Sequence, residues 1–494
     1  MDSSLDLSCA LVIFGATGDL THRKLLPAIY NLYQQKVLSD NFALIAIGRR
    51  DKTNEEYRVE VYKSIKQFSR FSIEEEVWDG IKNRIYYKSM DFLQKEKYVE
   101  LNDFLTEMDR KHNTKGNRIY YMAVAPEYFE GIVDKLSSCC MNKVEKAWKR
   151  VVIEKPFGRD LQSAKYLNSK IVDVFQEENT YRIDHYLGKE MLQNIMVLRF
   201  ANMLFEPLWN NKYIDNIQIS SSETVGVENR GGYYERAGAM RDMVQSHMLQ
   251  LISLIGMEPP NDLDPESIRN EKVKVLKALK RINLEDIEEN VVRGQYSSGQ
   301  SDKETIIGYR EEKRVASSSN TETFVALKVY IENFRWARIP FYIRTGKRMP
   351  KKSTEIIIQF KSIEDILYFK EKQLQPNMLV IRIQPREGVF FQFNAKEPGT
   401  EQNIIPVQMD FCQNCQIGIN SPEAYERLLY DVMRGDATLF ARWDEVEYSW
   451  KFVDSILEAW KNQNPTFPNY EAGTWGPKEA ELLLQKDKKR WMNI

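Results

Sequence analysis

Two of the four histidines in this chain lie among residues that could carry acid–base or anion-binding chemistry. His247 lies in the stretch 240–255, where apolar residues recur at the spacing of a buried helix face. One interpretation is therefore a core histidine. The other is a general base, because imidazole titrates near neutral pH, provided that a carboxylate holds its second nitrogen. The local sequence does not identify that carboxylate.

The second histidine, His185, lies in the mostly polar stretch 182–190. If this stretch is helical, His185 and Lys189 are four residues apart and share a face, with Tyr186 beside them. An imidazole, a phenol and an ammonium group on one side could together bind a phosphate group. An exposed helix with an ordinary lysine is the alternative interpretation.

A glycine turn, Gly15-Ala-Thr-Gly18, stands between the apolar stretch 10–14 and the amphipathic stretch 24–35. A strand, a turn and a helix in this order present backbone N–H groups to the pyrophosphate of a dinucleotide. The third glycine of the usual fingerprint is absent, so a plain structural turn is the alternative.

Arg49 and Arg50 follow the next apolar stretch, 42–47, at the position where folds that prefer NAD carry an acidic residue. Guanidinium groups match the geometry of a phosphate and stack on an adenine. This pair therefore favours the 2′-phosphate of NADP, with a basic surface pair as the alternative.

Two further basic positions could contact an anionic substrate. Lys155 follows the apolar stretch 151–153, and parallel sheets bind ligands at the carboxyl ends of their strands. A lysine there can reach both coenzyme and substrate, although an ordinary strand-end lysine would look the same. The basic stretch 344–352 is either solvated surface or a second contact for the substrate.

The elements that must position these residues differ between the two parts of the chain. Short apolar stretches alternate with amphipathic ones over the first part, which predicts a Rossmann-like, doubly wound parallel sheet with strands near 10–14, 42–47, 118–122 and 150–154. The later strands are longer, with few crossover helices between them, which predicts a large, mostly antiparallel sheet with flanking helices. These later strands are expected at 214–223, 323–334, 341–344, 355–360, 378–383 and 389–394, with helices at 240–255 and 424–433. We therefore predict an α/β domain over 1–184 and an α+β domain over 185–494.

The composition of the chain narrows the classes of function. Its 494 residues include 70 Lys and Arg and 71 Asp and Glu, so the net charge of −1 gives no basis for a nucleic-acid or membrane-surface binder. No apolar stretch is long enough to span a bilayer and the start of the chain is acidic, so we expect a cytoplasmic protein. The pair Cys412-x-x-Cys415 has no second pair near it, so we expect no metal site.

Beyond these patterns, the sequence resembles the glucose-6-phosphate dehydrogenase family over nearly its whole length. The resemblance is carried, in the family's order, by GATGDL, EKPFG, RIDHYLGKE, ENRGGYYE, RDMVQSHMLQ, VRGQY, IPFYIRTGK, LVIRIQP, YERLLYDVM, DATLFARWDEVE and AGTWGP. RIDHYLGKE is highly specific, and the joint match is far stronger than any single motif.

The resemblance implies an activity. Members oxidise β-D-glucose 6-phosphate at C1 to 6-phospho-D-glucono-1,5-lactone, the first step of the oxidative pentose phosphate pathway. They pass hydride to NADP and, in some bacterial members, also to NAD. The larger domain of the family commonly forms a dimer interface, so we expect a homodimer or a dimer of dimers.

The resemblance also implies roles for single residues. His247 looks like the base that takes the C1 hydroxyl proton, and Asp184 like the carboxylate that orients it. The implied substrate contacts are Lys155, which bridges sugar and coenzyme, the phosphate ligands His185, Tyr186 and Lys189, the sugar-hydroxyl ligands Glu223, Asp242 and Lys347, and the nearby basic positions Lys352 and Lys24. The implied coenzyme contacts are Gly15, Thr17, Gly18, Asp19, Leu20, Arg49, Arg50 and Lys155.

Two other functions remain as alternatives at this point. One is a different Rossmann-type sugar oxidoreductase, because a Glu-Lys-Pro strand end also occurs in the glucose-fructose oxidoreductase type. The other is a non-catalytic redox sensor that binds NADP. A sensor need not keep a base, so the presence of both Asp184 and His247 argues against it.

Overall fold

The computed structural model describes residues 7–143, 147–301, 304–363, 374–399, 403–412, 422–461 and 463–493. The chain forms two compact units. Unit 1 comprises residues 1–189, 262–269 and 420–447, and unit 2 comprises 190–261, 270–419 and 448–494. The first break falls close to the boundary that we expected after residue 184. The segments 262–269 and 420–447, which we expected in the second domain, lie in unit 1.

Unit 1 contains a seven-stranded sheet in the order β18-β6-β5-β4-β1-β2-β3. Its strands are β1 (Cys9–Phe14), β2 (Phe42–Gly48), β3 (Ile85–Ser89), β4 (Arg118–Met122), β5 (Lys149–Ile153), β6 (Thr180–Ile183) and β18 (Phe440–Ala441). All neighbours are parallel except β18, which pairs antiparallel with β6. The order from β3 to β6 is that of a doubly wound dinucleotide-binding sheet, so the predicted fold of this part is confirmed.

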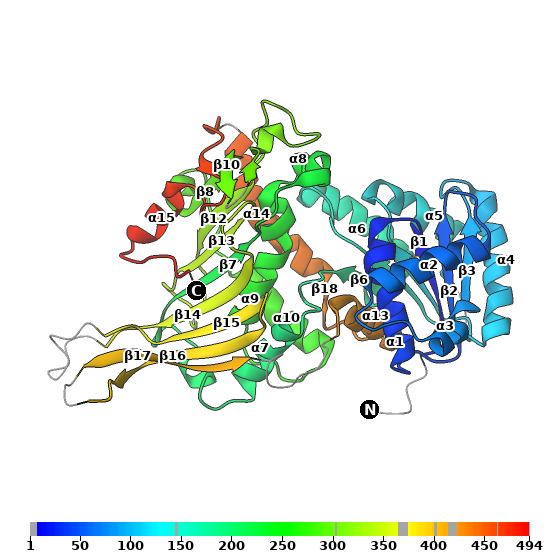
Figure 1. Cartoon of the computed structure of the whole chain (residues 1–494), viewed down its shortest axis with the longest axis horizontal. Helices are drawn as coiled ribbons and strands as arrows, with labels where there is room; N and C mark the ends of the chain where they lie inside the picture. The colour runs from blue at the N-terminus through cyan, green and yellow to red at the C-terminus, as the bar shows by residue number, and fades with distance from the viewer. Residues whose placement is uncertain are drawn as a thin grey trace. The chain divides into compact units, whose positions relative to one another are not determined.

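The helices of unit 1 form two groups around this sheet (Figure 1). The first is η1 (Thr21–Leu25, a π-helix), α1 (Leu26–Gln34), α2 (Asn54–Phe68), α3 (Glu75–Lys82) and α13 (Ala424–Arg434). The second is α4 (Lys95–His112), α5 (Phe129–Ser138) and α6 (Leu161–Phe175), with the short 3-10 helices η2 (Pro126–Tyr128) and η3 (Glu177–Asn179). Because helices cover both faces, every residue of β1, β2 and β4 is buried.

Helix α13 joins unit 1 through a buried polar contact. Glu426 on α13 pairs with Arg70 at 2.7 Å and accepts a hydrogen bond from the Asn31 side chain on α1 at 3.0 Å. The guanidinium and the amide satisfy a carboxylate that would otherwise be costly to bury. Together with the buried apolar residues Leu428, Leu429, Val432 and Met433 of α13, this contact holds a segment near the end of the chain against α1.

Unit 2 contains an eight-stranded sheet in the order β17-β16-β15-β14-β7-β13-β12-β8. Its strands are β7 (Ile214–Ser222), β8 (Val291–Gly294), β12 (Phe324–Val329), β13 (Phe341–Gly346), β14 (Ser353–Phe360), β15 (Met378–Gln384), β16 (Gly388–Lys396) and β17 (Ile404–Cys412). The neighbours β7 and β13 are parallel and all the other pairs are antiparallel. The predicted, mostly antiparallel sheet is therefore confirmed.

The helices of unit 2 include the element that carries His247. It is a π-helix, η6 (Met240–Met248), which contacts β13 and continues into α9 (Leu249–Gly256). The remaining helices are α7 (Glu190–Phe200), α8 (Gly231–Ala239), α11 (Ile287–Asn290), α15 (Lys478–Gln485) and the 3-10 helices η4 (Glu206–Leu208), η5 (Glu228–Arg230) and η7 (Tyr309–Glu311).

Four short strands and two longer helices complete the described elements. The strands are β9 (Tyr296–Ser297), β10 (Gly299–Ser301), β11 (Glu304–Ile306) and β19 (Tyr470–Glu471). The helices α10 (Pro265–Lys277) and α14 (Trp443–Lys461) are each divided between the two units along the chain. No helix in the described ranges is both long and apolar enough to cross a membrane.

Candidate active site

The glycine turn directly after β1 requires its first glycine. Gly15 has a φ of +101°, and a Cβ at this position would lie 2.1 Å from the carbonyl oxygen of Ala123. The Gly15 carbonyl accepts hydrogen bonds from the Gly18 N–H at 3.0 Å and from the Thr21 hydroxyl at 2.9 Å. The turn is thus held closed at the start of the helical segment, and the N–H groups of Gly15 and Ala16 both donate to the Ile47 carbonyl at the end of β2.

A cavity of about 580 Å³ adjoins this turn and the carboxyl ends of β2 and β4. It is lined by Gly15, Thr17, Gly18, Gly48, Arg49, Arg50, Phe92, Ala123, Val124, Ala125 and Tyr128. None of these described lining residues is acidic. The structure therefore brings the predicted glycines, Thr17 and both arginines together, whereas Asp19, Leu20 and Lys155 are not among the lining residues.

Tyr128 is a cavity residue that the sequence analysis missed. The Arg49 guanidinium lies 5.8 Å from the centroid of the Tyr128 ring, and its Nη1 donates to the phenol oxygen at 3.4 Å. The ring limits the directions that the exposed Arg49 side chain can take. Its position just after β4, at the carboxyl edge of the sheet, is the signal that could have identified it.

The end of β5 carries a second polar cluster. Glu154 accepts hydrogen bonds from the hydroxyls of Tyr121 on β4, at 2.6 Å, and of Tyr425 on α13, at 3.2 Å. Burial raises the pKa of Glu154 to about 7, and the two phenols and Lys155 oppose that rise. Lys155 therefore directly follows a residue, Glu154, whose side chain is held by hydrogen bonds from both β4 and α13. The peptide bond between Lys155 and Pro156 is cis.

The segment after β6 corrects one expectation. Residues 185–189 form a turn and not a helix, and α7 begins only at Glu190. Asp184 is 1% exposed, its Oδ1 accepts from the Tyr186 N–H at 3.0 Å, and its carbonyl accepts from the Leu187 N–H at 2.9 Å. The first of these bonds uses the side chain of Asp184 to close a turn, which competes with helix formation.

The turn nevertheless groups the three predicted phosphate ligands. The Lys189 ammonium lies 4.0 Å from the centroid of the Tyr186 ring, and the rings of His185 and Tyr186 meet edge to face at 5.1 Å. A cation, a phenol and an imidazole therefore lie within one short segment. Such a set of donors suits the oxygens of a phosphate group. Lys24, by contrast, pairs with Glu423 at 2.8 Å.

Unit 2 groups most of the predicted sugar ligands. Glu223 follows β7 and Lys347 follows the adjacent parallel strand β13, and their side chains form an ion pair. The Lys347 ammonium lies 5.1 Å from the centroid of the Tyr234 ring, while the Tyr233 hydroxyl donates to Asp242 at 3.2 Å. The sequence analysis missed both tyrosines, although they belong to the motif ENRGGYYE.

His247 and Lys352 differ in their surroundings. His247 is 2% exposed and lies on η6 with Asp242. Lys352 is exposed and directly precedes β14. Within unit 2, the predicted base therefore occupies a buried position and the further basic residue a solvated one.

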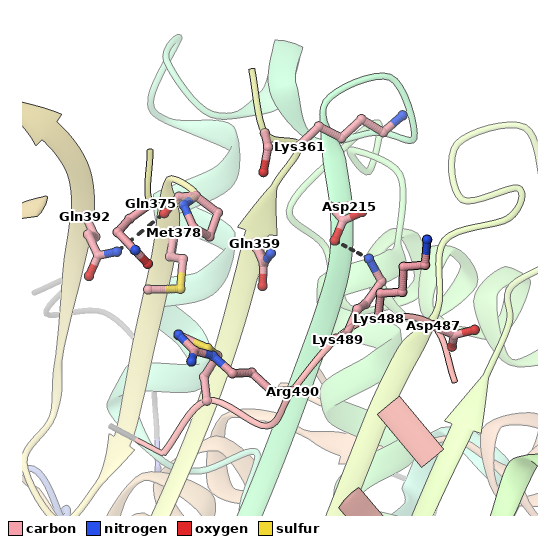
Figure 2. Close-up of a pocket in the computed structure, with 13 residues that line it drawn as sticks. Asp215, Gln359, Lys361, Gln375, Met378, Gln392, Asp487, Lys488, Lys489 and Arg490 are labelled. Carbon is pink, nitrogen blue, oxygen red and sulfur yellow. Dashed lines mark hydrogen bonds and ion pairs between the residues drawn. The ribbon is translucent and has the colours of Figure 1, made fainter. Parts of the chain in front are cut away.

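A second cavity, of about 720 Å³, lies on the face of the unit 2 sheet (Figure 2). Figure 2 shows Gln359, Met378 and Gln392 from three neighbouring strands beside the segment 487–490, with Lys489 paired to Asp215. No residue that we predicted for the site lines this cavity. We therefore assign it no part in the chemistry below.

Comparison with known proteins agrees with this arrangement. The family model described as "Glucose-6-phosphate dehydrogenase, NAD binding domain" matches residues 12–194, and the model of the C-terminal domain matches residues 196–492. This chain belongs to the glucose-6-phosphate dehydrogenase family. Membership confirms the predicted resemblance and the oxidoreductase class, and the first model implies a pyridine-nucleotide coenzyme. Neither alternative function is favoured by these matches.

The similarity to individual relatives covers all or nearly all of this chain. The chain is 50% identical over 495 residues to a glucose-6-phosphate 1-dehydrogenase of Bacillus subtilis, with 100% of both chains covered. It is 46% identical to one from Chlamydia pneumoniae, which covers 98% of this chain and 96% of that protein. A solved glucose-6-phosphate dehydrogenase in complex with its substrate glucose-6-phosphate superposes with a TM-score of 0.90 at 32% identity, covering 100% of both chains.

Proposed function

We propose that this chain oxidises β-D-glucose 6-phosphate at C1 to the 6-phosphogluconolactone with NADP as the preferred hydride acceptor. The observation that carries the coenzyme preference is the cavity beside the glycine turn, where Arg49 and Arg50 stand and none of the described lining residues is acidic. An acidic side chain there would bind the ribose hydroxyls of NAD and repel a 2′-phosphate, whereas two guanidinium groups attract it.

The cavity fits the coenzyme on chemical grounds. The start of the helical segment after the glycine turn suits the pyrophosphate, and Arg49 and Arg50 suit the 2′-phosphate. When bound, NADP supplies the nicotinamide ring that accepts the hydride. The chain itself supplies the two groups of residues that hold the coenzyme, one at its pyrophosphate and one at its 2′-phosphate.

Acid–base chemistry in this proposal belongs to His247. Its imidazole removes the proton from the C1 hydroxyl, and the electron density left on that oxygen drives hydride away from C1. Family resemblance gives Asp184 the role of the carboxylate that orients the imidazole and stabilises its protonated form. Glu223, Asp242 and Lys347 would hydrogen-bond the sugar hydroxyls.

The phosphate ligands of unit 1 act far from the reacting carbon. His185, Tyr186 and Lys189 would hold the phosphate of the sugar, and Lys155 would bridge sugar and coenzyme. The binding energy of the sugar's phosphate group, which does not react, can be used to position C1 for hydride transfer. The proposal therefore separates the residues that bind from the residue that transfers a proton.

The Arg49→Ala variant tests the coenzyme assignment. We expect its KM for NADP to rise about 10- to 100-fold, the range for loss of a charge-assisted hydrogen bond, while its KM for NAD changes less than about threefold. Initial rates with each coenzyme at saturating glucose 6-phosphate measure both values. Arg110→Ala, an exposed arginine in the last turn of α4, is the matched control. Equal losses with NADP and NAD would refute a contact with the 2′-phosphate.

We also propose that two copies associate through the edge of the unit 2 sheet. Strand β17 stands at the end of the strand order, and its side chains are mostly solvent-exposed, with Met409 at 66% and Phe411 at 37%. An exposed edge strand with apolar side chains is typical of a protein interface. Sedimentation equilibrium should give twice the chain mass of 58.1 kDa, and a Met409→Asp variant should shift it toward the monomer. A monomeric wild-type protein at micromolar concentration would refute the proposal.

A further inference from the structure

The helix that carries Asp242 and His247 has a different hydrogen-bond register from the helix that follows it. Residues Met240–Met248 are π-helical, and α9 (Leu249–Gly256) continues them in the ordinary α register. In a π-helix each N–H bonds to the carbonyl five residues earlier, and such segments are rare and often occur at functional sites. At the end of the segment the Leu249 N–H donates to the carbonyls of both Ser246 and Val244, the second of which lies five residues earlier.

This register decides which side chains share a face. Asp242 and His247 are five residues apart. In an α-helix, at about 100° per residue, residues with that separation point about 140° away from each other. In a π-helix the hydrogen bond itself joins residues five apart, so their side chains point in much more similar directions than in an α-helix. The π register therefore places Asp242 and His247 on the same side of η6, which an α-helix would not do.

The start of the π-helix is fixed by one buried carboxylate. Glu322 is 6% exposed, and its Oε1 accepts a hydrogen bond from the Met240 N–H at 3.0 Å. Its own carbonyl accepts from the Ala239 N–H, also at 3.0 Å. Glu322 thus satisfies two consecutive backbone donors where α8 ends and η6 begins. A helix start has unpaired N–H groups, and a negative charge there is favourable.

The backbone before η6 is shaped around the same side chain. Gly238 has a φ of +64°, which interrupts the helix, and a Cβ there would lie 2.3 Å from the Glu322 Oε1. Burial raises the pKa of Glu322, and the Met240 N–H together with Arg241 and Arg293 opposes that rise. The junction therefore accepts a carboxylate only because a glycine leaves the space for it.

We propose that Glu322 is a positioning residue that fixes the π register of η6, so that Asp242 and His247 present their side chains to one side of the helix. This inference rests on the proposed roles of those two residues. Glu322 itself need touch neither substrate nor coenzyme. Its effect passes through the Met240 N–H.

The test compares Glu322→Ala with Glu322→Gln. Glutamine keeps an oxygen that can accept from the Met240 N–H, so we expect its kcat to stay within about threefold of wild type. Alanine removes the acceptor, and we expect kcat to fall about 10²-fold, the loss that a misplacement of about 1 Å can cause. Hydrogen exchange of the amides of 240–248 should become faster in the alanine variant only. Glu322→Asp replaces the alanine variant if that variant does not fold.

Glu312→Ala is the matched control, because Glu312 is a buried carboxylate of the same unit, 7% exposed, that accepts from the Tyr296 hydroxyl at 3.0 Å. We expect it to lower the melting temperature without a comparable loss of kcat. The inference is overturned if Glu322→Ala keeps its kcat, if Glu322→Gln loses as much as alanine, or if Glu312→Ala loses equally. Full turnover of a His247→Asn variant would instead overturn the proposed role of His247, so the two failures are distinguishable.

Discussion

Replacing His247 with asparagine should lower kcat about 10³-fold and leave the KM for glucose 6-phosphate within about threefold, because a general base contributes about 10²- to 10⁴-fold to a rate. Asparagine keeps a polar side chain in a position that is 2% exposed, so it leaves no large cavity, but it cannot accept the C1 hydroxyl proton. Steady-state rates of NADPH formation measure both parameters. A loss in kcat alone identifies an interaction made in the transition state.

His112→Asn is the control for that experiment. His112 lies at the end of α4 and its Nε2 is 2.8 Å from the Tyr86 hydroxyl, in a part of unit 1 with none of the predicted site residues. We expect this variant to keep the wild-type kcat. If His247→Asn turned over at the wild-type rate, His247 would have no place in the mechanism.

Replacing Lys189 with alanine should raise the KM for glucose 6-phosphate about 10- to 100-fold, as expected for loss of a charge-assisted hydrogen bond to a phosphate, with a much smaller change in kcat. The ammonium already lies 4.0 Å from the Tyr186 ring centroid, so little reorganisation is needed to present it to the phosphate. Kinetics over a range of sugar phosphate concentrations check this expectation.

Unphosphorylated glucose provides an internal control for Lys189→Ala. A ligand without a phosphate makes no contact with the ammonium, so kcat/KM for glucose should be the same in the variant and the wild type. Lys97→Ala, which removes a surface lysine paired with Glu100, should change neither substrate. An unaltered KM for glucose 6-phosphate in Lys189→Ala would exclude this lysine from phosphate binding.

Local patterns predicted the elements of unit 1 well. The apolar stretches 10–14 and 42–47 became the buried strands β1 and β2, and Gly15 and Arg49 meet at one cavity because both follow parallel strands. The carboxyl ends of such strands lie at one edge of the sheet, so sequence position alone implies their proximity. The scarcity of crossover helices between the later strands likewise indicated a mostly antiparallel sheet in unit 2.

Features that depend on distant residues could not be read from these patterns. The return of α13 to unit 1 involves contacts between residues far apart in sequence, such as the pairing of Glu426 with Arg70. The turn at 185–189 is closed by the Asp184 side chain, which accepts from the Tyr186 N–H, although the spacing of His185 and Lys189 suits a helix. The π register of η6 depends on Glu322, which lies far along the chain from Met240.

The central claim is that His247 transfers a proton whereas Lys189 binds the phosphate of the sugar. Measuring both binding and turnover for His247→Asn and Lys189→Ala tests this claim most directly. Calorimetric titration with glucose 6-phosphate gives the dissociation constant, and the NADPH assay gives kcat. We predict that His247→Asn binds the sugar phosphate like the wild type and hardly turns over, while Lys189→Ala binds it weakly and turns over at saturation. Loss of the same parameter in both variants would contradict separate roles for the phosphate ligands and the base.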